Sequence, residues 1–243
     1  MAILGVIGGL GPMATAYFMQ LVTSMTDAAT DQEHLRMVVY SAPDIPDRTR
    51  YILGKSSESP LPGILDAGLK LKSIGAEVIA IPCVTAHYFQ QEIEQGLGVH
   101  TLNAVSGTTQ MLAEHGIKTV GLMATEGTVQ SGLFQREFDK QGLTLITPGS
   151  EDQELVTSLI YNDVKQGREP DMDAFRRVKE GLVKRGAEAV ILGCTELSVI
   201  KRDYDTGDGT LDVMEVLAAM SIEACGKQLK NELVIKTCLG EIR

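Results

Sequence analysis

The stretch Gly75-Ala-Glu-Val-Ile-Ala-Ile-Pro-Cys83 recurs in the second half of the chain as Gly186-Ala-Glu-Ala-Val-Ile-Leu-Gly-Cys194. In both copies an apolar, β-branched run ends at a cysteine that is followed by small polar residues. This pattern predicts a duplicated strand with a thiol at its carboxyl end. Ligands of open parallel α/β sheets bind at that end of the strands, so we expect the two thiols to face one cleft.

A second match supports the duplication. Gly5-Val-Ile-Gly and Gly121-Leu-Met-Ala each follow an apolar or β-branched approach and precede a turn of small residues and a helix. The turns span residues 8–15 and 124–131. The spacing differs slightly from that of the cysteines, so a short insertion or deletion separates the two matches. We infer two similar α/β lobes.

Apolar runs alternate with amphipathic stretches along the chain, which is the βαβ pattern of a parallel sheet. We expect strands at residues 3–7, 37–40, 78–81, 119–123, 144–146 and 189–192. Helices are expected between them, for example at 63–74 and 172–185, each ending near a glycine that suits a helix C-cap. The predicted fold class is α/β, with two pseudo-symmetric lobes, each a parallel sheet flanked by helices, and an active site in the cleft between them.

The same pattern predicts where the lobes divide. We expect the first lobe over residues 1–99 and the second over 100–210, with the polar segment 201–210 as a connection. A helix at 211–230 has apolar residues at helical spacing and is expected to return to cover the first lobe. Residues after Asn231 are expected to form a short apolar strand or tail.

The composition excludes several classes of partner. The chain has 243 residues and a net charge of −10, which argues against nucleic acid or an anionic membrane as the main partner. No segment approaches the roughly 18 consecutive apolar residues of a membrane span. The amino terminus lacks a basic region and is interpreted as a first strand, not a signal peptide. The four cysteines are therefore expected to be reduced in a cytoplasmic protein, and their spacing gives no support for a metal site.

The turn Gly9-Leu-Gly-Pro-Met-Ala14 fits the dinucleotide-binding fingerprint G-x-G-x-x-A. That fingerprint also needs an acidic residue about 20 positions later, and Asp44 lies farther away than that. The alternative is a tight strand-to-helix turn with Pro12 at the first helical position. The N–H groups of such a turn could hold a carboxylate, so a non-catalytic nucleotide- or amino-acid-binding protein stays as an alternative.

A free cysteine is more often a small buried hydrophobe than a catalyst. Cys83 and Cys194 differ from this ordinary case because a thiol is kept at the same place in both copies, while the strands before them vary among apolar residues. Cys225 and Cys238 lie outside the repeat and are interpreted as structural or incidental.

Three motifs in order give the chain a specific resemblance. They are Gly8-Gly-Leu-Gly-Pro-Met-Ala-Thr15, Pro82-Cys-Val-Thr-Ala-His87 and Leu192-Gly-Cys-Thr-Glu196. With them the chain resembles the aspartate/glutamate racemase superfamily, most closely its aspartate racemase branch, over nearly its whole length. The resemblance implies racemisation of an amino acid, most simply aspartate or glutamate, with Cys83 and Cys194 as the acid/base pair. It also implies that no pyridoxal phosphate or metal is needed. Members of this superfamily often form homodimers, so a homodimer is expected here.

Elementary chemistry supports the two-thiol assignment. Inverting an α-carbon requires removal of a proton from one face and delivery of a proton to the other. A thiol with a pKa near 8.5 can serve in either role near neutral pH. Developing charge needs preorganised donors at the strand ends. We expect these to be the hydroxyls of Thr85 and Thr195 and the amides of Val84 and Ala86, with Thr125 as a further substrate contact.

The resemblance also implies cationic substrate contacts at Arg48 and Lys165, although both could be ordinary surface charges. Arg50 is a neighbour that could substitute for Arg48. Further supporting residues, each with a plain structural alternative, are Gly9, Met13, His87 and Glu196. His87 is expected to orient or cap the segment after Cys83, or else to act on the thiol as a charged neighbour. Glu196 is expected to be a helix N-terminal acid or a hydrogen-bond partner of the site.

One residue departs from the racemase pattern. Many aspartate racemases have asparagine directly after the first cysteine, whereas this chain has Val84. Valine keeps the backbone N–H but lacks the amide's two donors and one acceptor. The substrate is therefore open to a different amino acid. Within the superfamily, another carbanion-forming isomerase or a decarboxylase is the competing interpretation, but a decarboxylase would need only one proton donor.

Overall fold

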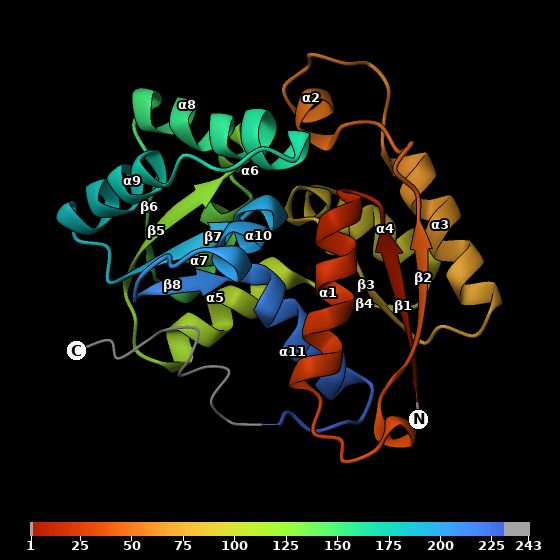
Figure 1. Ribbon diagram of the computed structural model, residues 1–243. Helices are drawn as coiled ribbons and strands as arrows, with labels where there is room; N and C mark the ends of the chain where they lie inside the picture. The colour runs from red at the N-terminus through yellow and green to blue at the C-terminus, as the bar shows by residue number, and fades with distance from the viewer. Residues whose placement is uncertain (1, 231–243) are drawn as a thin grey trace.

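The computed structural model describes residues 2–230, which form two four-stranded sheets whose strand pairs are all parallel (Figure 1). The first sheet has the order β2-β1-β3-β4, with β1 at Ile3–Gly8, β2 at Arg36–Ser41, β3 at Val78–Ala80 and β4 at His100–Thr101. The second has the order β6-β5-β7-β8, with β5 at Thr119–Ala124, β6 at Thr144–Ile146, β7 at Ala189–Gly193 and β8 at Thr210–Asp212. The two sheets thus have the same strand order, which confirms the predicted two-lobed α/β fold.

The six predicted strands are confirmed with small shifts at their ends, and two strands were not predicted. These are β4 and β8, which pair with β3 and β7 respectively. Two expectations need correction here. The segment 201–210 is not wholly a connection, because its first residues end α10 (Thr195–Asp203) and Thr210 begins β8. The helix expected at 211–230 begins only at Val213, because Asp212 is its N-cap and accepts a hydrogen bond from the Met214 amide. It ends at Ala224.

Helices cover the outer face of each sheet. In the first lobe these are α3 (Leu61–Ser73) and α4 (Gln90–Leu97), and in the second they are α8 (Ser150–Ser158) and α9 (Met172–Lys184). Each outer layer has an apolar core of its own, centred on residues such as Ile79 and Ile93 in one lobe and Phe175 and Val190 in the other.

Four helices lie between the two sheets and share one central core (Figure 1). They are α1 (Pro12–Met25), α5 (Ala104–Glu114), α7 (Leu133–Gln141) and α11 (Val213–Ala224). The central core contains Phe18, Phe134 and Phe138, all essentially inaccessible. Complete burial of one such ring stabilises the fold by about 1.5–3 kcal/mol, so this shared core joins the lobes firmly.

The last helix of each half packs against the other half. α5 follows β4 of the first sheet and packs on α7, whereas α11 follows β8 of the second sheet and packs on α1. α5 and α11 also contact each other. The chain then returns to the end of α1, where Lys230 donates its amide to the Met25 carbonyl. The division into residues 1–99 with 211–230 and residues 100–210 is kept as a proposal, and the tail expected after Asn231 lies outside the described residues.

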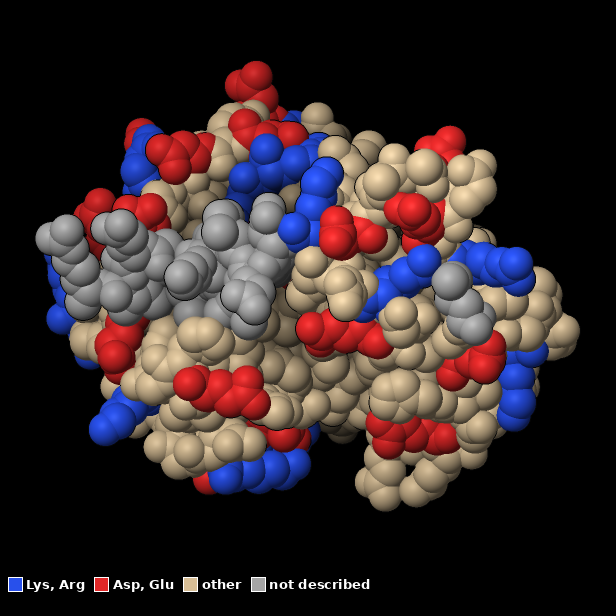
Figure 2. All heavy atoms as spheres, turned by 90° about the horizontal axis from the view of Figure 1, so that it is seen from below, with Lys and Arg blue, Asp and Glu red and all other residues tan. Residues whose placement is uncertain are grey.

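Two surface properties bear on partners. Among residues 2–230, no helix has the length and apolar character needed to cross a membrane. On the face shown in Figure 2, acidic side chains are interspersed with basic ones.

Candidate active site

The two repeated cysteines occupy equivalent places in the two lobes. Cys83 follows β3 and is the N-cap of a 3-10 segment, Val84–Phe89, and Cys194 follows β7 and is the N-cap of α10 (Thr195–Asp203). Each is 6% exposed. Both side chains line one cavity between the lobes, at the carboxyl ends of the strands.

The cavity is built from both halves of the chain and is small. Its volume is about 20 Å³, close to the space needed by one water molecule. Besides the cysteines, the residues that line it are Leu10, Asp47, Arg48, Thr49, Val84, Thr85, Thr125, Tyr161, Lys165, Thr195 and Glu196. We call it the thiol cavity.

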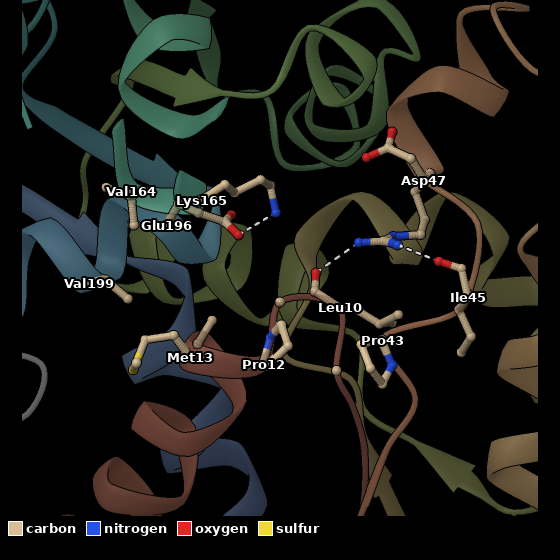
Figure 3. Close-up of a pocket in the computed structure, with 14 residues that line it drawn as sticks. Leu10, Pro12, Met13, Pro43, Ile45, Asp47, Val164, Lys165, Glu196 and Val199 are labelled. Carbon is tan, nitrogen blue, oxygen red and sulfur yellow. Dashed lines mark hydrogen bonds and ion pairs between the residues drawn. The ribbon is translucent and has the colours of Figure 1, made fainter. Parts of the chain in front are cut away.

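A larger pocket of about 390 Å³ adjoins the thiol cavity (Figure 3). Its walls combine polar groups with apolar residues such as Pro12, Met13, Ile45 and Val199. We call it the outer pocket. Five residues line both spaces and therefore form the boundary between them: Leu10, Asp47, Arg48, Lys165 and Glu196.

Arg48 is a buried cation on the first-lobe side of this boundary. It begins α2 (Arg48–Ile52), and its guanidinium donates to the carbonyls of Leu10 at 2.8 Å, Ile45 at 3.2 Å and Pro46 at 3.1 Å. Its Nε is buried without a hydrogen-bond acceptor among the described residues. Burial alone would lower the pKa of Arg48, but the Cys83 sulfur, followed by Asp47 and Glu196, raises it above its ordinary value. The charge is thus fixed beside Cys83.

Lys165 reaches the boundary from a break in regular helix. α8 ends in a π-helical turn, Leu159–Asp163, and a 3-10 turn, Val164–Gln166, which carries Lys165. Such irregular turns are common at functional sites. The Lys165 Nζ donates to Glu196 Oε1 at 2.5 Å and lies 5.7 Å from the centre of the Tyr161 ring. Burial alone would lower the pKa of Lys165, but Glu196 and the Cys194 sulfur raise it, so this side chain is a cation.

Glu196 connects that cation to the second thiol. Its side chain is 7% exposed, and its Oε2 accepts hydrogen bonds from Cys194 Sγ at 2.9 Å and Thr195 Oγ1 at 3.3 Å. Burial, followed by the Glu196 carboxylate, raises the pKa of Cys194 well above its ordinary value. Gly11 of the first lobe lies against this group, because a Cβ built there would be 3.0 Å from Glu196 Oε1.

Three buried threonine hydroxyls form a ring, and two of these threonines, Thr85 and Thr125, line the thiol cavity. Thr85 Oγ1 lies 3.1 Å from Thr125 Oγ1 and 3.0 Å from Thr128 Oγ1, and the last two are 3.0 Å apart. Thr125 is the N-cap of α6 (Glu126–Gln130) and also accepts from the Thr128 amide. The ring therefore joins the segment after Cys83 in one lobe to the glycine-containing turn of the other.

Some residues expected at the site lie elsewhere or have other partners. The Ala86 amide donates to the Cys83 carbonyl, and Ala86 is not part of the cavity wall. His87 is buried, which lowers its pKa, and its Nδ1 is 2.8 Å from Gln90 Oε1. Arg50 is exposed and lines neither space.

The opening turn contributes to the outer pocket and not to the thiol cavity. Gly9 and Met13 both line the outer pocket. The Gly9 amide, expected as a carboxylate donor, instead donates to Thr15 Oγ1 at 2.9 Å. Gly9 has a φ of +88°, and a Cβ there would lie 2.5 Å from the Ala42 nitrogen, so the turn needs glycine to pass β2 this closely.

Sequence reasoning missed five residues that the structure places at the thiol cavity or in its threonine ring: Leu10, Asp47, Thr49, Thr128 and Tyr161. Thr128 lies in the turn at residues 124–131, which follows a predicted strand, and this position could have marked it as a site residue. Tyr161 and Asp47 gave no comparable signal, because only the three-dimensional fold brings them to the cavity. Burial raises the pKa of Tyr161 to about 12, so this phenol stays protonated.

Comparison with known proteins gives concordant matches. The family model Asp/Glu/Hydantoin racemase matches residues 7–221. The broad specificity amino-acid racemase RacX of Bacillus subtilis (strain 168) is 27% identical over 223 residues, covering 90% of this chain and 96% of that protein.

Among solved structures, Picrophilus torridus aspartate racemase superposes with a TM-score of 0.84 at 34% identity, covering 97% of this chain and 99% of that one. Glutamate racemase from Francisella tularensis, solved with D-glutamate, has a TM-score of 0.67 at 14% identity, with 98% and 83% covered, which shows the shared fold.

Proposed function

The chain belongs to the Asp/Glu/hydantoin racemase family and is an amino-acid racemase, and we propose that it interconverts the enantiomers of aspartate or glutamate with Cys83 and Cys194. The observation that supports this most is the thiol cavity, in which two buried cysteines at equivalent N-cap positions face one space from opposite lobes.

In the proposed reaction, the thiolate of one cysteine removes the α-proton and the thiol of the other delivers its proton to the opposite face of the same carbon. One Cα–H bond breaks, a new one forms on the other side, and the two sulfurs exchange protonation states. Proton transfer by positioned groups of this kind accelerates reactions by about 10²–10⁴-fold. Both cysteines are required because inversion involves both faces of the carbon.

The negative charge that develops on the substrate needs donors aimed at it. The threonine ring of Thr85, Thr125 and Thr128 offers three buried hydroxyls beside Cys83, and Thr195 offers a fourth beside Cys194. We propose that the substrate's α-carboxylate replaces one of the contacts within the ring. Buried, preorganised hydroxyls stabilise such charge more than water does, because they do not have to reorient during the reaction.

The side-chain carboxylate of an acidic substrate fits the two cations of the boundary. Arg48 has an unpartnered Nε, and Lys165 carries protons that it can share between Glu196 and a ligand. A wider substrate range is the second candidate. It is favoured by Val84, which replaces an amide with an apolar group at the cavity wall, and by the apolar residues of the outer pocket.

Substrate must enter through the outer pocket, since the thiol cavity holds only about one water in this structure. Entry therefore requires the boundary to open, with separation of contacts such as Lys165–Glu196 and Arg48–Leu10 (Figure 3). Closure behind the substrate would exclude water from the carbanionic species.

The decisive experiment is incubation of the purified protein with single enantiomers of a broad amino-acid panel in D2O, without added cofactor. We expect deuterium at Cα together with loss of optical rotation, first for aspartate and glutamate. Absence of exchange across the whole panel contradicts the proposed function. Release of CO2 without exchange would favour a decarboxylase.

Two further expectations follow from family membership and stay proposals. We propose a homodimer in solution, which light scattering at several protein concentrations tests. We also propose a cytoplasmic location, which fractionation of the source cells tests.

A further inference from the structure

The two thiols of the cavity have different charged neighbours. Cys194 Sγ is 2.9 Å from a carboxylate oxygen of Glu196. Cys83 has no carboxylate within hydrogen-bonding distance among the described residues, and the Arg48 guanidinium lies beside its sulfur. A repeat that places two cysteines in equivalent positions has thus given them different neighbours.

The contacts of Glu196 fix which atom carries the proton at Cys194. Its Oε1 accepts from the Lys165 ammonium at 2.5 Å, which favours an ionised carboxylate. An ionised carboxylate can only accept hydrogen bonds, so the bond at Oε2 needs an S–H donor. A thiolate in that place would put two negative charges 2.9 Å apart in a region nearly closed to water, where such repulsion is strong.

The contacts of Arg48 have the opposite effect at Cys83. Three backbone carbonyls hold the guanidinium in place, so in the closed structure its positive charge is fixed beside the sulfur. Nε is a further donor of this guanidinium, and it has no acceptor among the described residues. A cation with an unused buried donor beside a sulfur favours the thiolate.

Other charged or titratable groups near the sulfurs do not cancel this difference. Tyr161 lines the cavity as a neutral phenol, and the Asp47 carboxylate has a partner of its own, because its Oδ1 accepts from the Arg50 amide at 2.7 Å. Lys165 interacts with both sulfurs but is hydrogen-bonded to Glu196, which partly neutralises it.

We propose that Glu196 is a positioning residue that keeps Cys194 protonated in the free enzyme, so that Cys83 is the resting base and Cys194 the resting acid. This assignment of roles rests on the proposed two-thiol racemisation. The enantiomer whose Cα–H points to Cys83 is therefore the one that the resting enzyme converts directly.

Each such conversion leaves Cys83 as a thiol and Cys194 as a thiolate. The second state places the Cys194 thiolate against the Glu196 carboxylate, so it returns to the resting state by loss of a proton from Cys83 to water and gain of one at Cys194. The two enantiomers have equal free energies in water, so kcat/KM must be equal in the two directions. The asymmetry therefore has to be measured on the thiols themselves.

The test is a pH titration of the full-length protein labelled with ¹³C at cysteine Cβ, followed by NMR. The variants Cys83→Ser and Cys194→Ser assign the two signals. In the unmodified protein we expect the thiolate shift to appear at lower pH for Cys83 than for Cys194. In Glu196→Gln the Cys194 transition should move down by about 1–3 pH units. Glu92→Gln, which removes an exposed carboxylate from the first turn of α4, should move neither signal.

If the thiolate of Cys194 forms at lower pH than that of Cys83, the proposal is overturned. This result comes from the unmodified protein, so it does not depend on whether the Glu196→Gln variant folds. An unchanged or raised Cys194 transition in Glu196→Gln would also overturn it. Deuterium exchange at the substrate Cα, measured on the same samples, tests the proposed racemisation separately from the order in which the two thiols lose their protons. Thiols that titrate as expected without any exchange would refute the racemisation and leave the protonation order standing, whereas exchange with the reversed order would refute only the present inference.

Discussion

Lys165 on the 3-10 turn after α8 and Glu196 in the first turn of α10 form an ion pair, Nζ to Oε1 at 2.5 Å, on the wall between the thiol cavity and the outer pocket. The glutamate side chain is 7% exposed and the lysine side chain 27%. The pair thus closes the route to the thiols and determines the charge beside one of them.

Replacing Lys165 with methionine should lower the free energy of unfolding by about 1–3 kcal/mol, because the Glu196 carboxylate is left in a nearly closed site without its cation. Urea denaturation measures the change. The double variant Lys165→Met/Glu196→Gln should lose less than the sum of the two single changes. Strict additivity would contradict the coupling. Lys184→Met, which breaks a highly exposed pair with Glu180, should change stability little.

Replacing either Cys83 or Cys194 with alanine should reduce racemisation by at least about 10³-fold, since each face of the α-carbon loses its proton carrier. Chiral chromatography of aspartate or glutamate measures this. Each variant should still exchange the Cα proton of one enantiomer, and the two variants should differ in which one. Cys225→Ala is the control, because this buried thiol lies in the central core away from the cavity. Full racemisation by either site variant contradicts the two-thiol mechanism.

Arg48→Met should raise KM for an acidic substrate by about 10-fold or more and lower the free energy of unfolding by about 1–3 kcal/mol. KM rises because the substrate's carboxylate loses a cationic contact. The free energy of unfolding falls because three backbone carbonyls lose their hydrogen-bond donor. Steady-state kinetics and urea denaturation measure the two effects separately. The neighbouring Arg50→Met removes an exposed charge and should leave both unchanged. Equal effects of the two replacements would rule out a specific role for Arg48.

Val84→Asn should shift preference toward aspartate, because it adds two donors and one acceptor to the wall of the thiol cavity. We expect kcat/KM for aspartate to rise relative to that for apolar amino acids, with some loss of stability from burying an amide. The same substrate panel used for the parent protein checks this. Val84→Ala controls for the change in packing, and an identical preference in both variants would contradict the expectation.

Asp212 should make stability depend on pH. It is fully buried, and burial, followed by Glu215, raises its pKa to about 7, although Ser198, Lys201 and the Met214 amide act in the opposite direction. Between about pH 4 and 7 the folded chain keeps a proton that the unfolded chain has lost, so this group's stabilising contribution falls as pH rises through that window.

Asp212→Asn should therefore gain stability relative to the parent protein as pH rises from 4 to 7, with no further change above that range. Thermal or urea unfolding at a series of pH values measures the difference. The control Asp44→Asn changes an exposed carboxylate and should track the parent protein at every pH. A pH-independent difference for Asp212→Asn would show that the carboxyl titrates normally.

Long, strongly apolar segments allowed the sequence to predict most of the fold. The strands around Ile7, Ile79 and Ile191 are continuous buried runs in a parallel sheet, which gives an unmistakable pattern. β4 and β8 were missed because two or three residues such as His100–Thr101 cannot display a period. They are strands only because β3 and β7 offer an open edge.

At the site, the thiols and the two cations were predictable because the repeat and the resemblance marked them. For Glu196 the sequence allowed two roles, a hydrogen-bond partner of the site or an acidic residue at a helix N-terminus. The pattern alone does not distinguish them. The Ala86 amide was expected as a donor to substrate, whereas in the structure it donates to the Cys83 carbonyl within the 3-10 turn, a local contact that the sequence pattern does not reveal. Contacts made between lobes, such as Thr85 with Thr128, are invisible to a pattern read along the chain.

The exchanged positions of α5 and α11 indicate how this site could become unequal on its two sides. In a symmetric pair of half-length chains with this packing, the last helix of each chain would cover the first helix of the other. In such a pair every change appears twice. One continuous chain is free of that restriction, and the position two residues after the thiol is Thr85 in one half and Glu196 in the other. A single gene can hold that difference, whereas two identical subunits cannot.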